Sequence, residues 1–264
     1  LAACIREYVL EARVASMADT GALVDRAVAE RAGIGWIGKN CAVITPEYGS
    51  WVFLGEMITN LPFEPDAPLA QDCGDCTLCL DACPTGALEG PGELNAPRCL
   101  SFLTQTKGML DDEDKHKLGS RLYGCDTCQL VCPKNKGLNW THQPELQPDP
   151  EEVKPLLMPL LALTNRQYRE KYGHNASSWR GRTPIQRNAI IALGNFREAA
   201  AVPQLSELMV HDPRPAIRES AAWALGRIGG ASAEAALRQA AERETDERVR
   251  AAIGRAILRM GDCP

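Results

Sequence analysis

The chain has 264 residues, of which 45% are apolar and 24% charged, with a formal net charge of −5. This composition is ordinary for a soluble globular protein of one large domain or two to three small ones. It contains no run of 18 apolar residues, which excludes a membrane-spanning helix. The acidic balance gives no global sign of nucleic-acid binding, and in the absence of a signal-peptide pattern we expect a cytoplasmic protein.

Residues 1–68 mix helical stretches with short strands. The stretch 23–32, "LVDRAVAERA", has apolar residues at helical spacing, and "CAVIT" (41–45) and "WVFLGEMIT" (51–59) are typical of strands. The chain opens at Leu1 in sequence typical of the middle of a domain, so we expect an N-terminal segment to be absent. The proline-rich "LPFEPDAP" marks the expected end of this part of the molecule.

Three glycines, Gly33, Gly35 and Gly38, have the spacing G-x-G-x-x-G of a dinucleotide-binding site. That site requires a strand before the first glycine and a helix after the last, so that backbone N–H groups point at the pyrophosphate. Here the expected order is reversed, with the helix first. We therefore interpret the glycines as a helix C-cap and a tight turn between a helix and a strand, and not as a nucleotide site.

Residues 69–135 carry eight cysteines in a two-cluster pattern. "CGDCTLCLDACP" from Cys73 is C-x2-C-x2-C-x3-C-P, the bacterial ferredoxin run, in which the fourth cysteine binds the other cluster of a pair. "CDTCQLVCP" from Cys125 supplies the last three positions of a second run, and Cys99 is the natural displaced first position. The pattern predicts a first cluster on Cys73, Cys76, Cys79 and Cys132, and a second on Cys83, Cys99, Cys125 and Cys128.

These cysteines also allow two other interpretations. Zinc ribbons use C-x2-C pairs as well, but they do not need the C-x3-C-P ending. Disulfides are disfavoured in a chain expected to be cytoplasmic. The three remaining cysteines, Cys4, Cys41 and Cys263, are expected to be ordinary small apolar residues.

The C-terminal part divides into a linker and a repeat. Residues 136–160 contain five prolines and indicate an extended linker. In residues 161–264, segments beginning at Ile185, Ile217 and Val249 align at a period of 32 residues, which predicts a short array of HEAT-like helical repeats. Because about three repeats are needed for a stable core, we expect the array to pack against the cluster domain.

Immediately before the repeats, residues 165–187 carry six basic residues and one acidic residue, with Tyr168, Tyr172 and Trp179 among them. A solvated helix face would also account for such a run. Basic charge concentrated in an acidic protein, with aromatic side chains beside it, nevertheless favours a nucleic-acid contact surface. The candidate contacts are Arg166, Arg169, Lys171, Arg180, Arg182 and Arg187.

Taken together, "DTGALVDRAVAERAGIGWIGKN", the two cysteine runs, "RLYGCDTCQLVCP", "SSWRG" and the repeat tail resemble the epoxyqueuosine reductase family, cobalamin-dependent iron–sulfur enzymes of queuosine-tRNA synthesis. The resemblance runs from about residue 16 to the end and implies an α+β fold. It implies part of a nitroreductase-like cobalamin domain (1–68), a ferredoxin-like domain with two 4Fe–4S clusters (69–135), the linker (136–160) and the helical repeats (161–264).

The resemblance also implies roles for individual residues. Cobalamin would contact Gly33, Gly35, Gly38, Lys39 and Asn40, and Ser101 is a further candidate because it follows a cluster ligand. The implied reaction removes an epoxide oxygen as water with two electrons and two protons, and Asp19 would donate a proton to that oxygen. The implied partners are tRNA carrying epoxyqueuosine and an external low-potential electron donor, and we expect a monomer that does not bind membranes.

Three alternative functions compete with this one. A ferredoxin-like electron-transfer protein would have clusters but neither corrin nor RNA binding. Reductive dehalogenases combine a corrin with two clusters but are usually exported and lack a helical-repeat tail. "ADTGA" around Asp19 imitates an aspartic-protease signature, but that enzyme needs a second carboxylate in a β-rich fold, and no second copy of the motif occurs.

Overall fold

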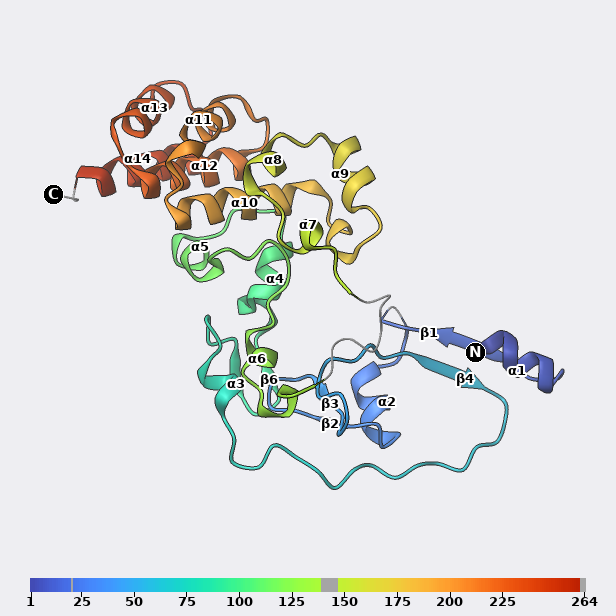
Figure 1. The fold of residues 1–264 in the computed structure, drawn as a ribbon. Helices are drawn as coiled ribbons and strands as arrows, with labels where there is room; N and C mark the ends of the chain where they lie inside the picture. Colours follow the sequence, from blue (N-terminus) through green and yellow to red (C-terminus); the bar gives the residue numbers. More distant parts are fainter. Residues whose placement is uncertain (20, 139–146, 262–264) are drawn as a thin grey trace. The chain divides into compact units, whose positions relative to one another are not determined.

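The computed structural model describes residues 1–19, 21–138 and 147–261. Two compact units make up the chain: Leu1–Asn95 with Asp126–His142, and Ala96–Cys125 with Gln143–Pro264. Figure 1 shows the helices and strands of each. None of the described helices is long and apolar enough to cross a membrane.

The first unit begins with short helices and strands, consistent with an α+β class. β1 (Val14–Met17) pairs antiparallel with β4 (Glu56–Thr59), and β2 (Trp36–Ile37) pairs antiparallel with β3 (Val43–Ile44). Helix α1 (Ala2–Tyr8) precedes β1. The predicted helix at 23–32 is α2 (Asp25–Arg31), and it is followed by the β2–β3 hairpin, which confirms the helix-before-strand order around the glycines.

The cysteine runs of the first unit fold into two short helices, α3 (Leu78–Asp81) and α6 (Thr127–Leu130), which pack against each other. Each carries the middle cysteine of its C-x2-C-x3-C-P sequence, Cys79 or Cys128, and ends before the cysteine that precedes the proline. The 3-10 turn η2 (Pro133–Asn135) follows α6, and the pair β5 (Leu88–Gly90) and β6 (Glu93–Leu94) follows α3.

The second unit is helical. Its elements are η1 (Ala96–Arg98), α4 (Leu100–Gln105), α5 (Asp112–Leu118), α7 (Pro150–Val153), α8 (Leu157–Ala162), α9 (Asn165–Tyr172), η4 (Ala176–Ser178), α10 (Arg182–Phe196), η5 (Ala199–Ala201), α11 (Val202–His211), α12 (Pro215–Ile228), α13 (Ala231–Ala241) and α14 (Glu247–Gly261).

The expected linker 136–160 is only partly described, because residues 139–146 lie outside the described residues. Its remainder is not fully extended, since α7 and the start of α8 fall within it. Pro150 occupies the first turn of α7, where its missing N–H costs nothing, and the Asp149 side chain caps that helix. A count of prolines therefore overestimated how extended this segment is.

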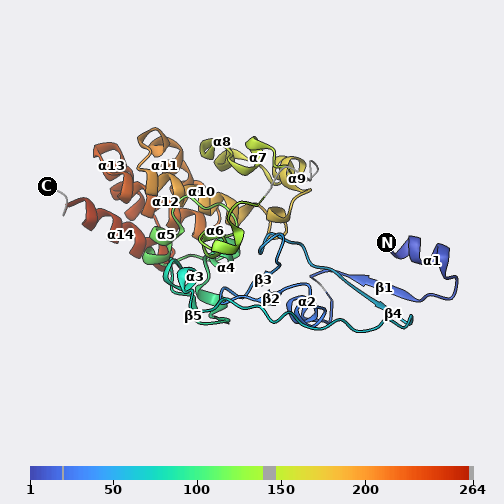
Figure 2. The same cartoon turned by 60° about the horizontal axis from the view of Figure 1, so that its bottom comes forward.

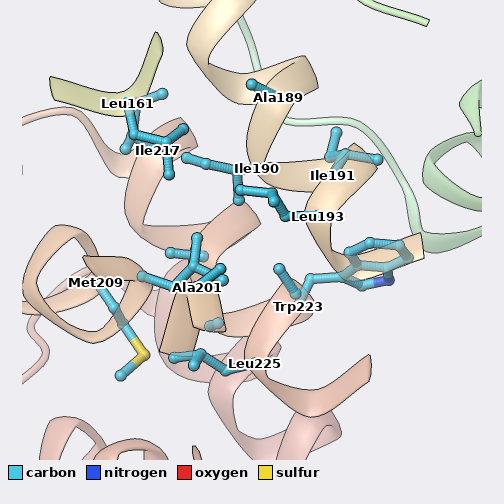
Figure 3. Packing of buried hydrophobic residues seen from close by; sticks show 14 of the residues in the cluster. Leu161, Ala189, Ile190, Ile191, Leu193, Ala201, Met209, Ile217, Trp223 and Leu225 are labelled. Atoms are coloured by element: carbon cyan, nitrogen blue, oxygen red, sulfur yellow. The ribbon is translucent and has the colours of Figure 1, made fainter. Parts of the chain in front are cut away.

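Helices α10, α12 and α14 lie side by side, and α11 and α13 pack on them as a second row (Figures 1 and 2). The repeat predicted from the period of 32 residues is thus confirmed. Two glycines let the first row pack closely: a Cβ at Gly194 would lie 2.9 Å from the Ala224 Cα, and one at Gly226 would lie 2.9 Å from the Ala256 Cα. Figure 3 shows the apolar core of this array, in which Ile190, Leu225 and Trp223 are buried.

Helices α4 and α5 complete the second unit by packing on α10. Arg187 on α10 has no exposed surface and donates hydrogen bonds of 2.7–2.8 Å to the backbone carbonyls of Leu103, Thr106 and Gly108. Its neighbour Asn188 donates to the carbonyls of Thr104 and Leu122. Within this unit, the segment 96–125 of the expected cluster domain is thereby attached to the helical array.

Candidate functional site

A pocket of the first unit brings four of the predicted cluster ligands together. Cys73, Cys76, Cys79 and Cys132 all line it, with Lys39, Asn40, Ile44, Leu78 and Pro133. Its wall is part of the small apolar core of this unit, in which Trp36, Ile44 and Cys132 are buried. These cysteines are the set predicted for the first cluster, although Cys132 is more than fifty residues from the others along the chain.

The side chains of this pocket suit the binding of an iron–sulfur cluster. Burial raises the pKa of the Cys79 thiol, and the nearby Cys73 and Cys132 sulfurs raise it further, which shows that these sulfurs converge on one place. The Asn40 side-chain nitrogen is buried and has no hydrogen-bond partner among the described residues. Cluster sulfurs accept such hydrogen bonds, and the bonds tune the cluster potential. The residues present therefore fit a 4Fe–4S cluster.

No three His, Cys, Asp or Glu side chains in the described ranges form a group that could hold a single metal ion. A cubane makes a different demand, because each thiolate binds a separate iron and the four sulfurs surround a larger object than one ion.

The second set of predicted ligands is divided between the two units. Cys83 and Cys128 belong to the first unit, and Cys99 and Cys125 belong to the second. The Ala87 N–H donates a 3.2 Å hydrogen bond to the Cys83 sulfur. Burial raises the pKa of this thiol, but hydrogen bonds from the backbone of Leu88, Thr85 and Ala87 outweigh it and leave the pKa below its usual value. These hydrogen bonds favour the thiolate form of Cys83, while its place in the second ligand set stays a prediction.

The cysteines outside the runs differ from one another. Cys4 is exposed and Cys41 is buried, so only Cys41 behaves as a core residue. Cys263 lies outside the described residues.

The glycines of the 33–38 segment are required by the protein's own packing. A Cβ at Gly35 would lie 2.4 Å from the Ile44 carbonyl oxygen, and one at Gly38 would lie 2.6 Å from the Ile44 side chain. Gly33 has φ +66° at the end of α2, which favours glycine. A close approach by a corrin is therefore not needed to explain these glycines, and their cobalamin contacts stay predictions.

The other candidate cofactor residues lie in different places. Lys39 and Asn40 line the cysteine pocket, and the Lys39 ammonium donates a 2.6 Å hydrogen bond to the Gly74 carbonyl. Ser101 belongs to the second unit, on α4, where its carbonyl accepts hydrogen bonds from Thr104 and Gln105. Of the candidates, Asn40 alone offers a buried donor that has no partner within the described chain.

Asp19 is an exposed residue that follows β1 and has φ +58°. Non-glycine residues rarely adopt this conformation, although aspartate is among the most tolerant of them. Its backbone N–H donates a 3.0 Å hydrogen bond to the carboxylate of Asp25, the first residue of α2. A residue of α2 therefore holds the backbone from which the Asp19 side chain projects.

The basic segment 165–187 separates into two classes. Arg166, Arg169, Lys171 and Arg180 are exposed. The Arg180 guanidinium lies 3.9 Å from the centroid of the Trp179 ring, which is itself 60% exposed. This combination of cations with an aromatic face suits contact with nucleic acid.

One predicted contact in this segment requires correction. Arg187 is fully buried and uses its guanidinium on backbone carbonyls, so it is not available to a tRNA. Arg182 is half-buried and donates to the Leu163 carbonyl, and its contact with tRNA stays a prediction. Charge counts along a sequence cannot separate the buried Arg187 on α10 from the exposed cations on α9, because burial depends on contacts with residues far away in the chain.

Comparison with protein families supports both the cluster-binding domain and the helical repeats. Residues 72–135 match the 4Fe-4S double cluster binding domain, and residues 181–257 match HEAT repeats. Among curated proteins, the epoxyqueuosine reductase of Bacillus subtilis (strain 168) is 62% identical over 93% of this chain and 64% of its own length. That of Listeria monocytogenes is 56% identical over 92% of this chain and 64% of its own length.

A crystal structure of an epoxyqueuosine reductase with a tRNA-Tyr epoxyqueuosine-modified stem loop is 58% identical, with a TM-score of 0.94. The match covers 98% of this chain and 69% of that one. The chain belongs to the epoxyqueuosine reductase family. It spans 64–66% of the length of the first curated epoxyqueuosine reductases that it matches.

One further epoxyqueuosine reductase structure, from Bacillus subtilis, is described with an aspartate catalytic loop swung out of the active site. It is 57% identical and has a TM-score of 0.93. Sequence reasoning overlooked Asp25, whose carboxylate accepts the Asp19 N–H, and Glu56, which lies opposite Met17 at the end of β1. Asp25 and Glu56 are 31 residues apart and share no motif; the pairing of β1 with β4 places Glu56, and a hydrogen bond from the Asp19 N–H places Asp25.

Proposed function

We propose that this protein reduces epoxyqueuosine to queuosine at the wobble position of tRNA. The observation that carries the proposal is the close likeness, with a TM-score of 0.94, to an epoxyqueuosine reductase solved with an epoxyqueuosine-modified tRNA stem loop. The four-cysteine pocket supports it, because the reaction needs single electrons at low potential and iron–sulfur clusters deliver them. The electrons come from an external low-potential donor, and the enzyme acts as a cytoplasmic monomer.

The proposed cofactors are two 4Fe–4S clusters and cobalamin. The first cluster is held by Cys73, Cys76, Cys79 and Cys132, with Asn40 donating a hydrogen bond to it or to the group beside it. The second is held by Cys83, Cys99, Cys125 and Cys128. Cobalamin, when bound, supplies a reduced cobalt centre that is a strong nucleophile towards a strained epoxide. A nitroreductase-like domain formed by residues 1–68 with further chain would hold it, with Lys39 and Asn40 as the best-placed contacts.

The role of the chain's own residues is to bind the tRNA and to supply a proton. The exposed cations Arg166, Arg169, Lys171 and Arg180 neutralise backbone phosphates. Asp19 donates a proton to the epoxide oxygen as its bond to carbon breaks. In the net reaction two electrons and two protons enter, the oxygen leaves as water and a cyclopentene ring remains.

The test is Asp19→Asn in a single turnover of epoxyqueuosine-tRNA by chemically reduced enzyme, so that electron delivery does not limit the rate. Asparagine keeps the size of the side chain but cannot give up a proton. We expect a rate loss of about a hundredfold or more, the usual contribution of a general acid. Cluster content and tRNA affinity should not change. The matched control is the exposed Asp66→Asn, and near-normal conversion by Asp19→Asn would contradict the role.

A further inference from the structure

Two carboxyl groups of the first unit, those of Asp25 and Glu56, line one pocket and interact with each other. Glu56 is the first residue of β4 and lies directly opposite Met17, the last residue of β1. Asp25 is the first residue of α2, and its carboxylate accepts the Asp19 N–H at 3.0 Å. The chain therefore leaves β1 opposite Glu56, and two residues later the Asp19 backbone is hydrogen-bonded to Asp25.

The carboxyl group of Glu56 is poorly satisfied as an anion. Both of its oxygens are buried, and neither has a hydrogen-bond donor among the described residues. A buried carboxylate without donors is costly. A protonated carboxyl resolves the problem, because its O–H can donate to Asp25, which stays ionised.

The direction of each pKa agrees with one shared proton. Burial raises the pKa of Glu56, and the adjacent Asp25 raises it further. The hydrogen bond from the Asp19 backbone lowers the pKa of Asp25, and the hydrogen bond from Glu56 lowers it as well. Two carboxyls that interact in this way titrate as a pair.

The other charged groups on neighbouring elements do not substitute for that proton. The Arg26 guanidinium on α2 donates to the Cys41 carbonyl, and the Glu30 carboxylate accepts the Ile37 N–H at 3.0 Å. Glu47 lines the same pocket as Asp25 and Glu56 but is exposed. The backbone N–H of Arg13, just before β1, donates a hydrogen bond to the side-chain oxygen of Asn60.

We propose that Asp25 and Glu56 share one proton and act as a positioning pair that fixes the Asp19 backbone for catalysis. The catalytic part of this inference rests on the proposed function, whereas the pairing itself does not. Above the raised pKa of Glu56 both carboxyls are charged and repel, and the hold on Asp19 weakens. Below the lowered pKa of Asp25 its carboxylate is protonated and the Asp19 N–H loses a charged acceptor. The hold on the Asp19 backbone is therefore strongest between these two limits. As the pH rises, it is lost through deprotonation of Glu56.

The test is residue-resolved hydrogen exchange at the Asp19 amide of the cluster-loaded protein, normalised for intrinsic exchange, from mildly acidic to mildly alkaline pH. In the wild type, protection should fall by up to about tenfold per pH unit between the ordinary pKa of a glutamate and the raised pKa of Glu56, and should level off above it, as expected for loss of one proton. Glu56→Gln keeps a neutral donor to Asp25, so its protection should stay constant. The matched control, Glu47→Gln, should behave as wild type. An identical pH dependence in wild type and Glu56→Gln would overturn the proposal.

A second set of measurements keeps the two ideas apart. In single-turnover assays Glu56→Gln should extend activity to higher pH, whereas a merely structural role would lower the rate at every pH. Asp19→Asn leaves the Asp19 backbone N–H in place, so its amide protection should follow the wild type even if turnover is abolished. Normal turnover by Asp19→Asn with a pH-dependent amide would sink the proposed proton donor alone. If Glu56→Gln does not fold, a carboxyl NMR titration of wild-type Glu56 decides, since an ordinary pKa would overturn the pair.

Discussion

Arg187 lies in a run of basic residues, yet its guanidinium is wholly internal. It reaches the carbonyls of Leu103, Thr106 and Gly108 from α10, and burial lowers its pKa to about 10, so it is still charged at neutral pH. One side chain thus provides donors for backbone groups of a segment some eighty residues away.

Replacing it tests that role. Arg187→Met keeps much of the volume but removes the guanidinium donors from the carbonyls of Leu103, Thr106 and Gly108, and a buried polar group left unsatisfied costs about 1–3 kcal/mol. We expect the free energy of unfolding to fall by about 3 kcal/mol or more, measured by chemical denaturation. Arg166→Met, at an exposed site on the same basic segment, should change it by less than about 0.5 kcal/mol. A similar small effect at both positions would contradict the structural role.

Cys99 is the residue on which the ligand sets depend most, because it is separated from its run. Cys99→Ala should remove the second cluster and leave the first, so that iron content falls by about half while one cluster signal remains in the visible and paramagnetic spectra. Cys4→Ala is the matched control, since Cys4 is exposed and outside both runs. Full iron content in the Cys99 variant would show that another ligand takes this position.

At the scale of elements, the exposed cations come from α9 and from the turn before α10. Arg166 and Arg169 lie on α9, and Arg180 lies against Trp179. Arg166 pairs with Glu170 at 2.8 Å, but a surface pair of this kind holds an arginine only weakly. A polyanion can therefore compete for it.

The triple variant Arg166→Ala, Arg169→Ala and Arg180→Ala should bind tRNA more weakly in all sequence contexts. The slope of log affinity against log salt should become shallower by about 0.7–0.9 for each phosphate that is no longer neutralised. A matched triple, Arg243→Ala, Arg248→Ala and Arg250→Ala, removes the same charge from exposed positions at the other end of the repeats. Equal slopes for the two triples would mean that net charge alone, and not this segment, governs binding.

Features that depend on local sequence patterns were predicted, whereas features that depend on long-range contacts were not. The cysteine runs and the 32-residue period are readable because each ligand or apolar residue repeats at a fixed spacing. Gly33 was interpretable because a helix before it and a strand after it are local signals. By contrast, the burial of Arg187 and the meeting of Asp25 with Glu56 depend on contacts between residues far apart in the chain. No spacing rule encodes such contacts.

At the scale of the whole molecule, the two units have very different cores. The first unit has a small buried cluster that includes Cys132 itself, with Cys73 packed against it. The second has a long continuous core through α10, α12 and α14. Removing iron therefore takes away an internal support of the first unit and little of the core that holds the repeats.

Chelation of iron under reducing conditions should expose the first unit to proteolysis, with cleavage in residues 1–95 faster by about tenfold or more, while fragments containing α10–α14 persist. Mass spectrometry of a limited digest measures both regions in one sample. The loaded protein under the same reductant is the control. Uniform acceleration of cleavage along the chain would show that the repeats depend on the clusters as well.

Gly194 and Gly226 occupy the same place in successive repeats, and each receives an alanine of the next helix. The equivalent position one period later is Leu258 on α14, whose side chain is 70% exposed. A leucine there holds any neighbour at a wider spacing than the two earlier contacts allow. One residue per repeat therefore sets how closely successive helices pack. The residue at position 258 would set the spacing to any further repeat. Leu258→Gly would restore the tighter pitch to any helix fused beyond it, which makes this face a natural place to lengthen the array by design.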